Sequence, residues 1–494
     1  MENTQIIRGS GMRRRRFAAR LAALSLALTT PWALAQTVDA GFAPQADDEV
    51  HVVVDHPDGG LFVGGFFRNI DGFAQGGLAK LDGDGHLAAG FAYSVFHDSA
   101  WSVSVLADGK LLVGGDIQQI NGTPRRGLAR LNADGSLDAS FADPQVIGRV
   151  YASAVQTDGR ILIAGHFSNV GSVARAYLAR LDADGNLDAA FDAQVDDWVE
   201  TMALQADGKI LIGGNFRNVG GTPRKYLARL DANGHLDAGF AAPEPNNRVD
   251  ALAVQPDGKI VVGGDFNGIG SDWFGHLVRL NANGSIDTTF EDPKLQSWAD
   301  SIVLQADGKL LVSGGFNAVA GMPRAGLARI NADGSLDTGF ADLGADHYID
   351  ALTLQTDGHL IVGGRYGQIG GLPMQKLARV TLAEPAQQSF TVDGAGTRVT
   401  WLRSGSSPEF GAPPILQRSL DGGATWATLG AMSRIAGGWQ RTGIPMIVDQ
   451  GYRLRADGLV PGGIGGNSQG RARVEGDYFF ADEIFADDFD DHGS

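Results

Sequence analysis

The sequence has 494 residues, of which 43% are hydrophobic, 71 are glycine and none is cysteine. A chain of this length exceeds one core of ordinary size, so it folds as two domains or as a repeat array. The net charge of −17 disfavours nucleic acid and anionic lipid as partners, and the lack of cysteine excludes disulfides and thiol chemistry.

Residues 1–35 have the pattern of a signal peptide. Arg13–Arg16 form a basic segment, residues 17–28 are apolar, and Ala33–Ala35 form a small-residue cleavage site. The apolar run is too short to span a membrane. We therefore expect a secreted protein, extracellular or periplasmic, with no membrane insertion. Removal of this segment, with its six arginines and one glutamate, brings the net charge to −22.

Seven Asp-Gly turns divide the next part of the chain into repeats. Successive turns are 50 residues apart, with one interval of 49. Their aspartates are Asp58, Asp108, Asp158, Asp207, Asp257, Asp307 and Asp357. A fixed period of this size indicates a propeller or a solenoid.

Residues 249–290 illustrate the repeat. Strand-like runs at 249–255, 259–264, 276–280 and 285–290 are joined by turns such as Pro256-Asp257-Gly258. Four short antiparallel strands are typical of a propeller blade, and the missing helical periodicity disfavours an α-solenoid. We predict an all-β fold in which residues 36–384 form a seven-bladed β-propeller of four-stranded blades.

The two ends of the repeat region complement each other. The seventh repeat stops at residues 377–380 and lacks the Leu-Asp-x-x-Phe strand, whereas residues 38–42 supply that strand alone near the N-terminus. We expect residues 38–42 to complete the last blade. A closed ring leaves no exposed sheet edge.

The repeats resemble the delta-60 repeat family, a β-propeller repeat of bacterial secreted proteins. The resemblance is carried by ALAVQPDGKIVVGGDF at 251–266 and by GGTPRKYLARLDANGHLDAGF at 220–240, and it spans residues 38–380. Repeats one, five and seven depart from it in the Pro-Arg segment. The resemblance implies propeller architecture and export, and it implies no activity.

The C-terminal region has a different composition. Strand-like runs at 398–402 and 452–455 predict a small β-sandwich over residues 385–475, of the fibronectin type III kind. Residues 419–426 match the Asp-box pattern of sialidases, which by resemblance is a folding hairpin without catalytic residues. Residues 476–494 are acidic and predict a disordered tail, with a sorting signal as the alternative.

A candidate ligand-binding site lies seven residues before each turn aspartate, at the entrance of each innermost strand. The ring reads His51, Trp101, Tyr151, Glu200, Asp250, Asp300 and Asp350, and Trp198, Trp298 and Tyr348 precede three members by two residues. Carboxylates can hold a cation or sugar hydroxyls, and aromatic faces can stack on a sugar ring. The alternative is a solvated rim without a ligand.

A cationic ring accompanies the acidic one. Its members are Lys80, Arg130, Arg180, Arg229, Arg279, Arg329 and Arg379. In six repeats they are expected to form structural ion pairs with the aspartates of the fourth strands, namely Asp138, Asp188, Asp237, Asp287 and Asp337, with Asp39 in the last blade.

Motifs of common enzymes are missing, including Gly-x-Ser-x-Gly, His-Glu-x-x-His and the P-loop. Residues 182–188 look like a calcium loop, but a hairpin turn explains them better. No cofactor is therefore expected, and calcium is the alternative, which no specific motif supports. We expect a non-enzymatic binding or scaffolding module for an extracellular polysaccharide or protein, of undetermined oligomeric state. The alternatives are a carbohydrate-active hydrolase or lyase using the ring carboxylates, and a purely structural envelope protein.

Overall fold

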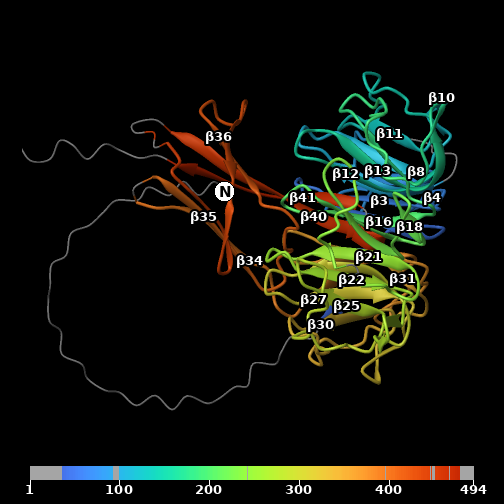
Figure 1. Cartoon of the computed structure of the whole chain (residues 1–494). Coiled ribbons are helices and arrows are strands. Elements are labelled where there is room, and N and C mark those ends of the chain that lie inside the picture. Colours follow the sequence, from blue (N-terminus) through green and yellow to red (C-terminus); the bar gives the residue numbers. More distant parts are fainter. Residues whose placement is uncertain are drawn as a thin grey trace, which may run out of the picture.

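The computed structural model describes residues 36–478, except 93–98, 242, 395, 446, 448–450 and 467. This part of the chain consists almost entirely of β-strands (Figure 1). The predicted signal peptide, residues 1–35, and residues 479–494 of the predicted tail lie outside the described residues. Within the described ranges, the single helix is the three-residue η1 (Ile464–Gly466), far shorter than a bilayer crossing requires.

Each repeat forms an antiparallel sheet with three long strands, and seven such sheets follow one another along the described chain. In the first sheet β2 (Val50–Asp55) pairs with β3 (Leu61–Gly65), which pairs with β6 (Leu78–Leu81). The other six sheets are β7 (Ser99–Val105), β8 (Leu111–Asp116) and β11 (Leu128–Leu131); β12 (Val146–Val155), β13 (Ile161–Val170) and β15 (Leu178–Leu181); β16 (Val199–Leu204), β17 (Ile210–Gly214) and β20 (Leu227–Leu230); β21 (Val249–Val254), β22 (Ile260–Gly264) and β25 (Leu277–Leu280); β26 (Ala299–Leu304), β27 (Leu310–Gly314) and β30 (Leu327–Ile330); and β31 (Ile349–Leu354), β32 (Leu360–Gly364) and β33 (Leu377–Thr381).

The sheets are arranged in a circle around a central channel. The innermost strands β2, β7, β12, β16, β21, β26 and β31 each contact the next one, and β31 contacts β2. The short strand β1 (Thr37–Val38) pairs antiparallel with β33, so that Thr37 lies opposite Thr381 and Val38 opposite Val380. The repeats therefore form a β-propeller in which the first and last repeats are neighbours.

The expectation of a fourth regular strand is wrong for the first six repeats. In its place the chain makes one bridge, such as Leu280 with Ile286, and then turns. The turn forms because Asp287 accepts hydrogen bonds from the backbone and hydroxyl of Thr289, at 3.1 and 2.7 Å. It carries the following aromatic residue into the space between sheets: Phe240, for example, is buried in the core cluster of β21 and β22.

The predicted ring of ion pairs is confirmed in six repeats. The arginines lie 2.6 to 2.9 Å from their aspartates, from Arg130–Asp138 to Arg379–Asp39. A second contact was not expected: Arg130 also donates to the carbonyl of Ala183 in the next repeat, at 2.7 Å. Arg379 makes the equivalent bond to Gly83 of the first repeat. These side chains therefore tie each repeat to its neighbour.

The C-terminal region contains two antiparallel sheets that share one core. The first has the order β34 (Gln387–Val392), β35 (Arg398–Ser404), β39 (Gly438–Thr442), β38 (Ser433–Ile435). The second has the order β37 (Ala427–Ala431), β36 (Ile415–Ser419), β40 (Tyr452–Gly463), β41 (Ser468–Tyr478). Trp401, Phe410 and Trp439 are buried in the core. The expected boundary at residue 475 is too early, because β41 continues to Tyr478, whose ring lies 6.1 Å from that of Tyr452.

The hairpin of β40 and β41 extends beyond its sheet and enters the central channel (Figure 1). Gly462 and Gly463 pair with β31, and the Thr201 and Ser301 hydroxyls each donate to a carbonyl of the tip at 2.9 Å. A Cβ atom on Gly462 would lie 2.5 Å from the carbonyl oxygen of Val53, so the glycines allow this close approach. The hairpin therefore fills part of the channel and joins the two domains.

Candidate functional site

All seven predicted ring residues occupy the same kind of position, a β-bulge in the innermost strand. In β21 the register with β22 shifts between Val249 and Ala251, which leaves Asp250 as the extra residue. The other six strands shift at the equivalent place. A bulge turns the extra side chain away from the regular ladder. The seven side chains are therefore presented by one repeated backbone device.

A glycine opposite each bulge makes this backbone possible. Gly264 lies opposite Val249, and a Cβ atom there would overlap the carbonyl oxygen of Arg248. The second glycine of the repeated Gly-Gly or equivalent pair has this role in the other repeats, for example Gly65 against Glu49. The Gly-Gly pair was thus a sequence signal for the bulge, and hence for the ring, that sequence reasoning missed.

Three ring residues form an aromatic wall. The imidazole of His51 stacks on the indole of Trp101, with ring centroids 4.5 Å apart and an interplanar angle of 10°. Trp101 meets Tyr151 edge-on at 5.4 Å. Phe66, which was not predicted, meets both His51 and Trp101 edge-on at 5.2 and 5.6 Å. His51 and Tyr151 are buried, Trp101 is partly exposed and Phe66 is 38% exposed, so Trp101 and Phe66 offer π faces on which a sugar ring or a cation can stack.

The four carboxylates have raised pKa values, and burial is the main cause in each. The pKa of Asp300 is raised to about 7 by burial and by the charge of Asp350, although Trp298 donates to its Oδ2 at 2.8 Å. Burial raises the pKa of Asp250 well above its ordinary value, against the nearby Arg248 guanidinium. Among the described residues, Oδ2 of Asp250 is buried without a hydrogen-bond partner.

The three additional aromatic residues are placed around this ring. Trp198 is 36% exposed and lies 4.4 Å from the ring of His166. Trp298 lies beside Asp300 through its hydrogen bond, and Tyr348 meets Trp298 at 5.2 Å. Because Trp198 and Tyr348 are both exposed, they are accessible to a ligand approaching the ring.

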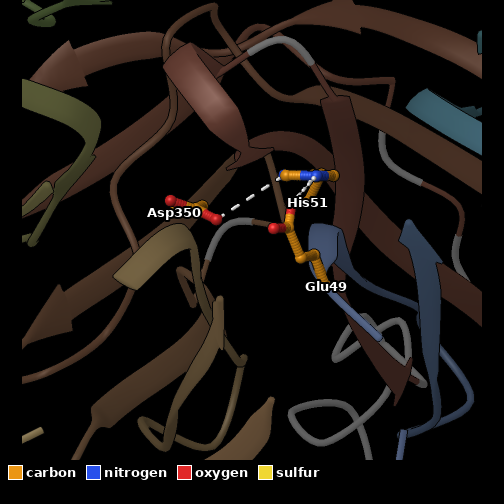
Figure 2. A group of neighbouring side chains, drawn as sticks. All are labelled: Glu49, His51 and Asp350. Atoms are coloured by element: carbon orange, nitrogen blue, oxygen red, sulfur yellow. Dashed lines mark ion pairs between the residues drawn. The ribbon is translucent and has the colours of Figure 1, made fainter. Parts of the chain in front are cut away.

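His51 also belongs to a charged cluster, shown in Figure 2. Its Nε2 lies 3.1 Å from Glu49 and its Nδ1 lies 3.7 Å from Asp350. Arg365 contacts both carboxylates, at 3.4 Å to Glu49 and 3.0 Å to Asp350. The imidazole beside Glu49 holds the pKa of that carboxyl below its ordinary value. Glu49 and Arg365 were not predicted from sequence.

The hairpin tip lies directly beneath the ring. Ser301 and Thr201, which bond to Gly463 and Gly465, each follow a ring carboxylate by one residue. Gly463 also approaches the backbone of His51. The ring therefore lies next to main-chain atoms of the hairpin tip, and we call the seven ring residues with this main-chain floor the channel cup.

A separate apolar cavity of about 370 Å³ lies on the other side of the floor. It is bounded by innermost strands, the base of the hairpin and the C-terminal domain. Its apolar lining includes Met202, Leu252, Val254, Leu459 and Pro461. The lining of this cavity includes none of the seven ring residues, so the cavity is separate from the channel cup.

Six segments of the chain match the family model of a β-propeller domain of unknown function, DUF5122. They are residues 56–91, 106–141, 156–191, 205–240, 255–290 and 305–340. These six matches support β-propeller repeats in this part of the chain, which is similar to that family. Each matched propeller segment ends at the phenylalanine that closes its repeat.

Two solved structures share a low level of similarity with the chain. One comes from a structural and mechanistic study of two prolyl endopeptidases; it is 13% identical, with a TM-score of 0.38, and the match covers 73% of this chain and 54% of that one. This chain thus spans about half the length of that endopeptidase. The other is apo AztD from Citrobacter koseri, which is 8% identical, with a TM-score of 0.23. The match covers 81% of this chain and 99% of that one. Both TM-scores are too low to support an inference. No curated protein matches the chain.

Proposed function

We propose that the protein is a secreted, non-enzymatic binding module that recognises an extracellular polysaccharide at the channel cup. The observation that carries this proposal is the ring of seven equivalent bulges, which presents aromatic groups on one side and carboxylates on the other. Aromatic faces favour stacking on sugar rings, and buried carboxylates favour hydroxyl donors. A protein ligand presenting cationic groups is the other partner that this chemistry suits.

We also propose the finer architecture of this module: a seven-bladed propeller followed by a fibronectin type III-like sandwich. The circle of innermost strands and the pairing of β1 with β33 support the first part. The strand orders β34-β35-β39-β38 and β37-β36-β40-β41 support the second, since immunoglobulin-type sandwiches have this arrangement. The inserted hairpin would make the sandwich a scaffold that holds the floor of the cup.

The test is a binding assay with protein beginning at Gln36, on immobilised polysaccharides and a cell-wall preparation. We expect retention on at least one polysaccharide without release of reducing sugar. Trp101→Ala and Asp250→Asn should each abolish it. Trp273→Ala is the matched control, because Trp273 is 62% exposed and lies on β24 (Asp272–Trp273), away from the ring. Binding that survives both ring substitutions would refute the proposed site.

A carbohydrate-active hydrolase or lyase is the second candidate. It is favoured by the pKa of about 7 for Asp300, which burial and then the charge of the neighbouring Asp350 carboxylate raise. A protonated carboxyl near neutral pH suits a general acid, and a second carboxylate can act as base or nucleophile. Release of reducing or unsaturated ends that disappears in Asp300→Asn would establish this activity in place of simple binding.

A further inference from the structure

We propose that Glu49, His51 and Asp350 bind one divalent metal ion of the zinc class, at the junction of the first and last repeats (Figure 2). The proposal adds a metal to the channel cup and so rests on the same site as the proposed function. It differs from the expectation that no metal is bound, which was based on the sequence motifs.

The three side chains are already gathered at the required scale. One ligand atom from each lies within 4.8 Å of the other two. In a tetrahedral zinc site with bonds of about 2.1 Å, ligand atoms are about 3.4 Å apart. Side-chain movements of about an ångström would therefore bring the three ligand atoms to the spacing of a zinc site.

The imidazole is available as a ligand. His51 is completely buried, and neither of its ring nitrogens makes a hydrogen bond with the described residues. The carboxylates lie at ion-pair distance without forming such bonds. A buried imidazole nitrogen without a well-aligned hydrogen bond is costly unless something binds it. A metal coordinated by His51 would remove that cost.

The ligand types select the metal. An imidazole with two carboxylates suits zinc and similar transition metals, whereas calcium and magnesium prefer oxygen ligands alone. Three protein ligands leave a coordination position for water or for a hydroxyl of a bound polymer. The chain has no cysteine, so thiolates do not compete for the ion.

Arg365 provides the positive charge near the two carboxylates in this structure. It lies 3.0 Å from Asp350 and 3.4 Å from Glu49, and its side chain is 40% exposed. A divalent ion would repel the guanidinium and displace it toward solvent. Removal of the Arg365 charge should therefore strengthen metal binding. If the cluster were only a structural set of ion pairs, the same substitution would weaken the cluster.

The experiment titrates chelator-treated protein beginning at Gln36 with zinc, calcium and magnesium salts, by calorimetry and tryptophan fluorescence. We expect one zinc ion per chain and a fluorescence change, because His51 stacks on Trp101. His51→Gln and Glu49→Gln should weaken binding more than about tenfold, because each removes one of three ligands. Arg365→Met should tighten it.

The control variant is His235→Gln, which breaks an exposed histidine–aspartate pair with a 3.2 Å contact and should leave the titration unchanged. Circular dichroism checks that each variant is folded, and Arg365→Met tests the proposal even if His51→Gln unfolds. Absence of stoichiometric zinc binding, equal binding in Glu49→Gln, weaker binding in Arg365→Met, or equal affinity for calcium would each overturn it. If polysaccharide binding persists in the presence of chelator and the protein takes up no zinc, only the metal proposal is refuted. If the protein takes up zinc but does not bind polysaccharide, only the proposed polysaccharide ligand is refuted.

Discussion

Asp55 offers a direct test of the contact between the first and last repeats. It is buried at the end of β2, where the other six repeats have valine or leucine, namely Val105, Val155, Leu204, Val254, Leu304 and Leu354. Its Oδ2 accepts hydrogen bonds from the backbone and hydroxyl of Thr356, at 3.2 and 3.0 Å, and Gln355 donates to Oδ1 at 3.4 Å. All three bonds cross from the first repeat to the last.

Burial raises the pKa of Asp55 to about 7, although these hydrogen bonds oppose the increase. In the unfolded chain the pKa is about 3.9. Between pH 4 and pH 7 the folded protein therefore binds more protons than the unfolded chain. The stabilising effect of the protonated carboxyl is complete below about pH 4 and is lost as the pH rises through about 7. The pKa difference corresponds to a loss of at most about 4 kcal/mol in the free energy of unfolding.

Asp55→Asn should remove this loss, because the amide keeps the shape of the protonated acid and carries no charge. Oε1 of Gln355 has no hydrogen-bond partner among the described residues, so a flip of the Gln355 amide would let it accept from Asn at this position. In urea unfolding followed by tryptophan fluorescence, we expect the variant to be about 2–4 kcal/mol more stable than wild type at pH 8. At pH 5 the two proteins should differ far less.

The control is Asp108→Asn, at an exposed turn, which should leave the difference between pH 5 and pH 8 unchanged. The reasoning would be refuted if Asp55→Asn kept the wild-type pH dependence or were destabilised at pH 8. Either result would mean that the carboxyl is ionised and solvated in the folded protein, and that the first and last repeats do not bury it between them.

Three further predictions concern the framework of the cup. Gly264→Ala should destabilise the protein by more than about 2 kcal/mol in urea unfolding, because its Cβ overlaps the carbonyl of Arg248; a stability within about 0.5 kcal/mol of wild type would contradict the bulge geometry. Gly462→Val should release the hairpin from the channel, which limited proteolysis would detect as faster cleavage between the two domains; an unchanged digestion pattern would argue against insertion. Arg379→Met should lower the free energy of unfolding by about 2–4 kcal/mol, since it leaves the partly buried Asp39 unpaired. An unchanged urea midpoint would show that this contact does not stabilise the junction between the first and last repeats.

Much of the propeller was predictable because its information is local and repeated. The Asp-Gly turns, the apolar runs and the 50-residue period specify strands and turns within each repeat. The pairing of Arg279 with Asp287 followed from their fixed separation across one turn. The ring positions, such as Asp250, could be aligned by counting, because every repeat places its bulge at the same distance from its turn.

Other features depend on contacts between residues far apart in the chain. Thr201 meets Gly465 across 264 positions, and the glycine-rich hairpin tip has no side-chain pattern that indicates its place in the channel. Glu49 and Arg365 join His51 only because the first and last repeats are neighbours. The fourth strand does not form because a turn, stabilised by side chains such as that of Asp287, competes with backbone pairing in the sheet. The sequence by itself thus determined the repeated strands and the ring positions through local periodicity, whereas the floor of the cup and its charged cluster were decided by tertiary contacts alone.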